Sequence, residues 1–545
     1  MERSVKTTFQ GILIGTFLVS IDQSVVGTVL PVIVQDLGDT WLYAWVAVAY
    51  TLGSAVALPV AGRLADIRSP NKLYCWALSL FCVTSLLCGM AQSMPELVAM
   101  RAVQGIGGGG MLAVGNALLG HMFPPAERAK YFGLVGATVG LAGLIAPLLG
   151  GLLADYLSWR LVFYINIPLV LYILHIFLFR NTIEPEITSE PFDLAGAITL
   201  ALSTSGFMLS LAIAGHTMEW TSPLVIGSAA LGVVSLAVFV RIERTSSYPL
   251  LNLNLLRNKP LTWSCLAQWG NAGVLMSAIL FLPLYLIHVR GFSATGAGLT
   301  LLSTTLCAIA SAVTLQKLMG KFGYKRLITL GSFGSVVLLT VAWWGFDQHT
   351  PLHTIVLFLC GLGFCFGMIM PVFSLVAQSA VEKKSLGTAS SLVQFARELG
   401  FTTSTAILGT LMVLTLHSTL PQLMPADLAK GLGVVEFKDQ QDLENQLSDR
   451  LNKLTKLADD DSEASREKLL SDPLVPGSLK EQIRGKQDVT DALHKLEIHY
   501  QEEIDRVLNT TLTRATAVTF VGGAFFALFC FLCCLRIPEI ELKKE

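Results

Sequence analysis

Fourteen apolar stretches run through the chain, and each is long enough to cross a lipid bilayer as a helix. A helix rises about 1.5 Å per residue, so about 20 apolar residues span the hydrocarbon layer. Lipid offers no hydrogen-bond partners, so the backbone of such a stretch must satisfy itself as a helix. The expected spans are residues 9–30, 42–61, 73–91, 97–119, 133–154, 161–179, 193–213, 224–241, 261–287, 295–315, 327–345, 352–377, 391–415 and 512–535. We therefore predict an all-α membrane protein with 14 transmembrane helices.

Charge agrees with this prediction and orients it. Charged residues make up 14% of the 545 residues, whereas soluble domains carry about 25%, so an ordinary cytosolic enzyme is excluded. Lys and Arg concentrate in the loops on the side of the N-terminus, and the short loops on the other side hold only Arg160 and Arg290. Because cytoplasmic loops are enriched in basic residues, we expect both termini in the cytoplasm.

Residues 416–511 differ from the rest of the chain because they are acidic and polar. They hold 19 of the 39 Asp and Glu but 12 of the 38 Lys and Arg, a net charge of −7 (12 minus 19). Leucines at helical spacing around 443–457, and a second periodic piece at 483–508, predict two helices on the outer side. A solvated helical hairpin and a lid that binds a partner or substrate both fit this pattern.

Asp22 and Arg101 are charged residues that lie inside expected spans of the first half of the chain. Asp22 interrupts a stretch that is otherwise free of acids and bases, and a carboxylate at that depth costs about 2.5–3.5 kcal/mol, so it indicates a function. Arg101 begins the segment Arg101-Ala-Val-Gln-Gly-Ile-Gly-Gly-Gly-Gly110. The arginine needs a partner or a wet cavity, unless it reaches the interface from the helix end. The glycines allow helices to approach closely.

Two further patterns involve glycine. The loop after the second span contains Gly62, Asp66 and Arg68, and we expect Asp66 at the N-terminus of the third span, where the helix dipole favours an anion. A similar pattern recurs at residues 317–327, which indicates two related halves. The fifth span carries Gly143, Pro147, Gly150 and Gly151, where proline kinks the helix and glycine permits close packing.

The Arg101 segment, the loop after the second span, its recurrence at residues 317–327 and the fifth-span pattern together resemble the fourteen-helix drug:proton antiporters of the major facilitator superfamily. The resemblance implies two six-helix bundles around a central cavity, with two additional helices between them. The expected divisions are 1–180 for the first bundle, 181–259 for the additional pair, 260–415 for five helices of the second bundle, 416–511 for the acidic loop, and 512–545 for the last helix and tail.

The resemblance also implies a function. Asp22 and Arg101 would couple transport to protons, and the residues of the two glycine patterns would gate it. The expected activity is export of hydrophobic or cationic drugs, across a bacterial cell membrane, in exchange for protons. Export of a lipid, glycolipid or siderophore on the same fold is the alternative. We expect a monomer that is not an enzyme and has no nucleic-acid partner.

Further polar and aromatic residues are candidates for substrate binding. Glu398 lies within a span beside Arg397, so it is either a substrate-linked acid or half of a compensated pair. Gln268, Asn271 and Trp263 would make the ninth span a cavity wall, since amides and aromatic faces suit hydrophobic or cationic ligands. No Cys or His spacing suggests a metal, and no phosphate-binding glycine loop is present in the sequence, so we expect no cofactor.

Overall fold

The computed structural model describes residues 3–39, 42–179, 190–217, 220–279, 281–424, 453, 463–472, 474–475, 480–481 and 490–539. Fourteen helices among them are long and apolar enough to cross a membrane, which confirms the predicted number. The described α-helices, with the short segments α6, α11 and α18 included, are α1 (Arg3–Leu37), α2 (Trp45–Ile67), α3 (Pro70–Met90), α4 (Met94–Met122), α5 (Pro125–Tyr156), α6 (Leu161–Tyr164), α7 (Asn166–Phe179), α8 (Leu194–Thr217), α9 (Pro223–Thr245), α10 (Lys259–Ile279), α11 (Leu282–Leu284), α12 (Ala294–Phe322), α13 (Tyr324–Gly345), α14 (Leu352–Ser379), α15 (Leu386–Leu423), α18 (Glu463–Ser471) and α20 (Thr490–Arg536).

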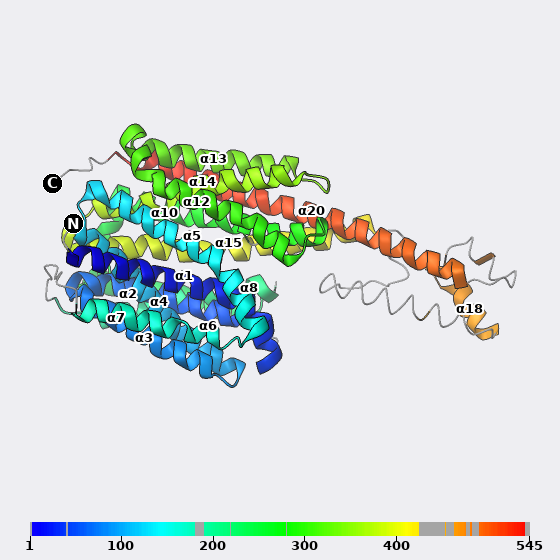
Figure 1. Cartoon of the computed structure of the whole chain (residues 1–545), viewed down its shortest axis with the longest axis horizontal. Coiled ribbons are helices and arrows are strands. Elements are labelled where there is room, and N and C mark those ends of the chain that lie inside the picture. Colours follow the sequence, from blue (N-terminus) through cyan, green and yellow to red (C-terminus); the bar gives the residue numbers. More distant parts are fainter. Residues whose placement is uncertain are drawn as a thin grey trace.

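The spanning helices form two bundles that lie side by side. In Figure 1, α1 to α4, α6 and α7 occupy one side, and α10 to α15 together with α20 occupy the other. Helix α5 lies between them and packs against both α1 and α12. The pair α8 and α9 is additional, and α8 packs against α2 of the first bundle and α15 of the second. Helix α1 begins and α20 ends at the same end of the molecule, which we call the terminal end; the opposite one is the distal end (Figure 1).

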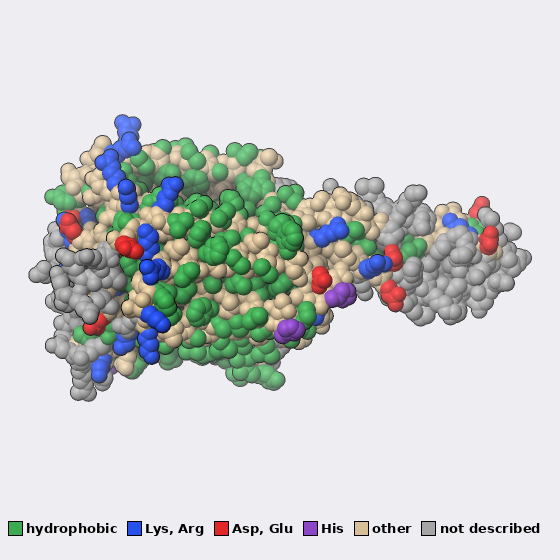
Figure 2. Space-filling model, turned by 90° about the horizontal axis from the view of Figure 1, so that it is seen from above, with side chains coloured by type: hydrophobic (Ala, Val, Ile, Leu, Met, Phe, Trp, Pro, Cys, Tyr) green, Lys and Arg blue, Asp and Glu red, His purple; other side chains and the backbone are tan. Residues whose placement is uncertain are grey.

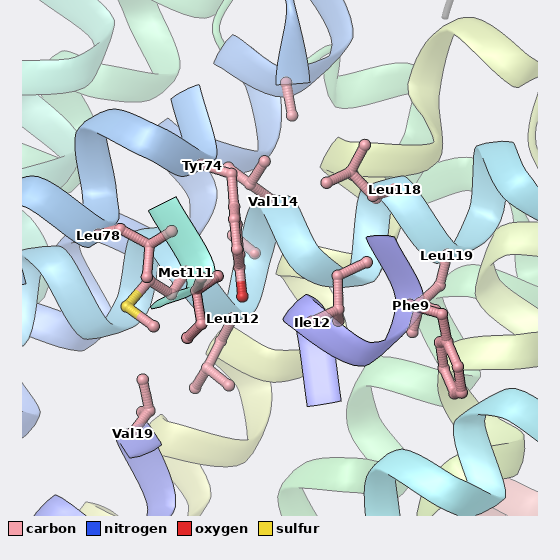
Figure 3. Close-up of a cluster of buried hydrophobic side chains, with 14 of the residues drawn as sticks. Phe9, Ile12, Val19, Tyr74, Leu78, Met111, Leu112, Val114, Leu118 and Leu119 are labelled. Atoms are coloured by element: carbon pink, nitrogen blue, oxygen red, sulfur yellow. The ribbon is translucent and has the colours of Figure 1, made fainter. Parts of the chain in front are cut away.

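Apolar packing builds each bundle from the inside. In the first, Phe9, Ile12 and Val19 of α1 meet residues of α3 and α4, including Tyr74 and Met111 (Figure 3). The outside is apolar too, as expected for helices that face lipid. Figure 2 shows hydrophobic side chains along the bundle and Lys and Arg gathered towards the terminal end.

Glycines explain the tight packing of α2 against α4. A side chain at Gly53 would collide with the carbonyl oxygen of Ala102, and one at Gly105 would collide with that of Tyr50. Gly109 lies equally close to the backbone of Ser54. The glycine run in the fourth span therefore allows close helix approach, as the sequence predicted.

The acidic block is described only in part. Helix α20 continues without a break from Thr490 into the membrane-spanning part, so the expected division at 511/512 falls inside one helix. It projects from the distal end of the bundle, and α18 lies near its start (Figure 1). The hydroxyl of Tyr500 donates to the carbonyl oxygen of Leu474 at 2.8 Å, which fixes the segment after α18 on α20. The helix predicted around 443–457 lies outside the described residues.

Candidate functional site

An ion pair lies at the centre of the first bundle. Nη1 of Arg101 donates to Oδ2 of Asp22 at 2.5 Å, and both side chains are at most 1% exposed. Arg101 therefore does not extend to the interface, which was one of the two sequence interpretations. A buried pair persists only where hydrogen bonds compensate the loss of water, so the surrounding groups matter.

A polar network surrounds this pair. Asp22 Oδ1 accepts from Asn166 Nδ2 at 3.0 Å and from Gln104 Nε2 at 3.2 Å, while Gln104 Oε1 accepts from Arg101 at 2.8 Å. Asn166 also donates to Ser85 Oγ at 3.1 Å. Helices α1, α3, α4 and α7 thus converge on one carboxylate. Gln104 lies in the Arg101 segment noted from the sequence, but neither Gln104 nor Asn166 was predicted as a site residue, although each is an amide in a largely apolar stretch.

Tyr50 of α2 covers the other side of Arg101. The guanidinium carbon lies 4.3 Å from the centre of the Tyr50 ring, a cation–π distance. The buried Tyr50 hydroxyl and Arg101 Nε have no hydrogen-bond partner among the described residues.

A cavity of about 400 Å³ adjoins this cluster. Its wall includes Arg101, Tyr50 and Glu398, so the arginine of the first bundle's ion pair and an acid of the second bundle face the same space. The remaining lining is mainly apolar or aromatic, as in drug-sized ligand sites: Gln23, Ala47, Val48, Thr51, Leu52, Met208, Leu211, Ala212, Gly215, Met276, Phe401, Thr402, Thr405 and Ala406. The cavity lies between α2, α8 and α15.

Glu398 is both a cavity residue and a member of an ion pair. Its Oε1 accepts from Arg397 Nη2 at 3.1 Å, and its side chain is 4% exposed. Arg397 does not line the cavity, because adjacent positions of a helix point about 100° apart. The two interpretations of Glu398 from sequence are therefore compatible.

Three expected substrate residues lie elsewhere. Gln268 borders a separate space of about 20 Å³ beside Asn116 and Gln394. Gln268 and Asn271 are each 1% exposed. Trp263 lies towards the terminal end, with the guanidinium carbon of Arg536 5.2 Å from its ring centre. Among the described lining residues of the larger cavity, Met276 is the residue from α10.

Asp66 joins the two bundles at the terminal end. Its carboxylate accepts from the backbone N–H of Gly387 at 2.7 Å, and from the N–H and hydroxyl of Thr388 at 2.8 and 2.6 Å. These groups form the first turn of α15. The expectation that Asp66 caps the third span is wrong, because Asp66 lies in the last turn of α2 and faces the second bundle. The physical preference for an anion at a helix N-terminus still applies.

Close backbone contact accompanies this connection. A side chain at Gly62 would meet the Ser391 hydroxyl and the Gly387 carbonyl oxygen, so α2 and α15 touch directly here. Arg68 ends α2 and is exposed. Nearby, Gln378 Nε2 of α14 donates to the Asn116 carbonyl oxygen of α4 at 2.8 Å. The two bundles are thus tied together at two points towards the terminal end.

The glycines of α5 differ along the helix in how closely they approach neighbouring helices. A side chain at Gly133 would collide with the Ala312 carbonyl oxygen of α12, and one at Gly140 would come within 2.8 Å of Ile309. Further towards the distal end, a side chain at Gly143 or Gly151 would meet no described atom within 4 Å, whereas Gly150 adjoins Thr28 of α1. Pro147 lies within α5, and its side chain is outside the described part. Helix α5 therefore packs closely against α12 on the part of its length nearer the terminal end.

Comparison with known proteins identifies the family and several similar chains. The sequence model of the Major Facilitator Superfamily matches residues 12–405. The "Multidrug transporter protein MdtP" of Bacillus subtilis (strain 168) is 33% identical over 406 residues, which cover 74% of each chain. "Multidrug resistance protein 3" of the same organism is 29% identical over 412 residues, covering 75% of this chain and 80% of the relative. The crystal structure of the human organic anion transporter MFSD10 has a TM-score of 0.57 at 13% identity, covering 76% and 95% of the two chains.

Proposed function

Because the chain belongs to the Major Facilitator Superfamily, we propose that it is a proton-coupled antiporter that exports hydrophobic or cationic drugs by alternating access. The observation that carries the proposal is that Arg101 both pairs with the buried Asp22 and lines the central cavity. A change of protonation at Asp22 would therefore change the electrostatic interaction between Arg101 and a ligand in the cavity. Relatives named as multidrug transporters support the substrate class.

Coupling follows from the charges of the pair. When Asp22 is ionised, it neutralises Arg101, and the cavity can accept a cation. When Asp22 takes up a proton, Arg101 loses its partner and its positive charge faces the cavity, so a cationic substrate is repelled. Breaking a buried pair by removing one charge costs about 3–5 kcal/mol, which is enough to change substrate affinity by more than a hundredfold.

Substrate recognition follows from the cavity wall. Glu398 supplies a negative charge, Tyr50 and Phe401 supply aromatic faces, and Met208 and Met276 supply polarisable thioethers. Such a lining suits an amphipathic cation with an aromatic or alkyl body. The volume of about 400 Å³ lies within the range of about 300–1,000 Å³ that is typical of drug-sized ligands.

The contacts between the bundles and the basic residues support an orientation in the membrane. The bundles are joined at the terminal end, where Figure 2 shows Lys and Arg gathered. Basic residues mark the cytoplasmic side, so we assign the terminal end and both termini to the cytoplasm of the cell. The protein would then be closed to the cytoplasm in this structure, with Asp66 as a latch that must release before substrate can enter from inside.

Reconstituted transport tests the proposal. In proteoliposomes with an imposed pH gradient, we expect accumulation of ethidium that a protonophore abolishes. Asp22→Asn should lose this accumulation but still exchange labelled for unlabelled dye without a gradient. Asp36→Asn is the matched control, because Asp36 lies on the same helix but pairs with Arg160 at 2.7 Å near the distal end. Full proton-driven accumulation by Asp22→Asn would refute the assignment.

A further inference from the structure

Helix α8 presents one stripe of side chains to the central cavity. Met208, Leu211, Ala212 and Gly215 line it, and these positions are spaced by three and four residues. Residues at this spacing lie on one face of a helix. A whole face of α8, rather than a single side chain, therefore forms part of the cavity wall.

The other faces of α8 have different neighbours. Ser203 donates to the Gly232 carbonyl oxygen of α9 at 3.1 Å, and a side chain at Gly206 would collide with the same turn. Ile198 and Leu202 are 51% and 44% exposed on the lipid-facing side. The cavity stripe is thus distinct from both the α9 contact and the lipid face.

Helix α8 also contacts both bundles. Its Ile213 packs in a cluster with Trp45 of α2. On α15, Ala406 Cα lies 3.2 Å from where a side chain at Gly215 would begin, so this contact is between backbones. Since α2 and α15 both line the cavity and α8 contacts both, α8 covers the seam between them beside the cavity.

We propose that α8 is a specificity-determining wall of the substrate site and selects how broad a monovalent cation the site accepts. This inference rests on the proposed function for its ligand class, an amphipathic cation attracted by Glu398. The stripe is apolar and contributes no charge, so it discriminates between ligands by their width rather than by their charge. Gly206 packs closely against the backbone of α9, and Gly215 packs against Ala406 of α15. These contacts keep α8 from moving aside for a broad ligand.

Equilibrium dialysis of the purified full-length protein tests this directly. The probes are tetraphenylphosphonium, which is broad, and dodecyltrimethylammonium, which is slender; both are monovalent. Ala212→Leu narrows the cavity and should weaken the binding of tetraphenylphosphonium, relative to that of dodecyltrimethylammonium, by about tenfold. Leu211→Ala widens it and should shift the Kd ratio the other way. Leu202→Ala is the matched control, because it makes the same change on the lipid face.

The outcomes separate this inference from the proposed function. An unchanged Kd ratio in Ala212→Leu, with an unaltered thermal midpoint, would overturn the role of α8. Equal shifts in Leu211→Ala and Leu202→Ala would do the same, and so would failure of the wild type to bind either cation. The dialysis involves no pH gradient, so absence of proton-driven transport would refute the antiport mechanism while leaving a changed ratio as support for the α8 wall.

Discussion

The latch between Asp66 and α15 makes a quantitative prediction. Asp66→Ala removes three hydrogen bonds to the first turn of α15, two from backbone N–H groups and one from the Thr388 hydroxyl. A hydrogen bond to a charged group contributes about 1.5–3 kcal/mol, and an N-cap about 0.5–2 kcal/mol. These contributions overlap, and the carboxylate regains water when the latch opens. We therefore expect a net loss of about 2–4 kcal/mol, or about 30- to 700-fold in the ratio of closed to open states.

Spin-label distances would measure this shift. Labels at Arg68 and Lys384, both exposed at the terminal end, report the separation of α2 from the start of α15. Attachment through unnatural amino acids leaves the ten native cysteines in place. The wild type should show mainly a short distance, and Asp66→Ala should add a population at longer distance.

A matched variant sharpens the test. Thr388→Val removes the hydroxyl bond at 2.6 Å but keeps both backbone donors, so its long-distance population should lie between those of the wild type and Asp66→Ala. If Asp66→Ala left the distance distribution unchanged, the hydrogen bonds to α15 would not hold the terminal end closed. The contact at Gly62 would then have to account for closure alone.

Three further predictions concern transport. Arg101→Ala should abolish proton coupling, and Arg101→Lys should restore it only in part because lysine lacks the planar guanidinium; equal, full pH-driven dye accumulation by both would contradict this. Glu398→Gln should reduce export of divalent cations more than of monovalent ones, as measured by initial rates, and an equal loss would favour a purely structural pair with Arg397. A short linker in place of the segment between α15 and α20 should keep proton-driven efflux within a few-fold, provided that membrane insertion is verified; loss of efflux would make the acidic block a working part of the cycle.

The sequence predicted the features that depend on local chemistry. Span positions follow from hydropathy, because each stretch must satisfy its backbone by itself in lipid. The close approach of α4 to its neighbours could be predicted from the glycine run, because a residue without a side chain permits close approach whichever helix is the neighbour. The involvement of Asp22 and Arg101 in one site was also inferable, because each charge is costly unless another group compensates it.

Long-range partners were less accessible. Asp66 could be assigned to a helix N-terminus, but nothing local to the second span indicates that this N-terminus lies more than 300 residues away at Gly387. Trp263 looked like a cavity residue because its type suits a ligand, yet its position on α10 places it beside Arg536. Which face of a buried helix points inward depends on all of its neighbours, and a helix that is apolar all round carries no signal for it.

The charges of the site balance in pairs, and this restricts when the bundles can reorient. Asp22 neutralises Arg101 and Glu398 neutralises Arg397, so the empty, unprotonated site carries no net charge from these four groups. In the proposed cycle a proton on Asp22 leaves Arg101 as an excess charge in an apolar centre, which is costly unless another acid compensates it. Glu398 lines the same cavity, but it already pairs with Arg397, so it leaves the charge of Arg101 uncompensated. With Asp22 protonated and no cation bound, the four groups carry a net charge of +1, and a bound monovalent cation would raise it to +2. The protonated site is therefore less costly to reorient without the cation, so we expect substrate release to precede the return step.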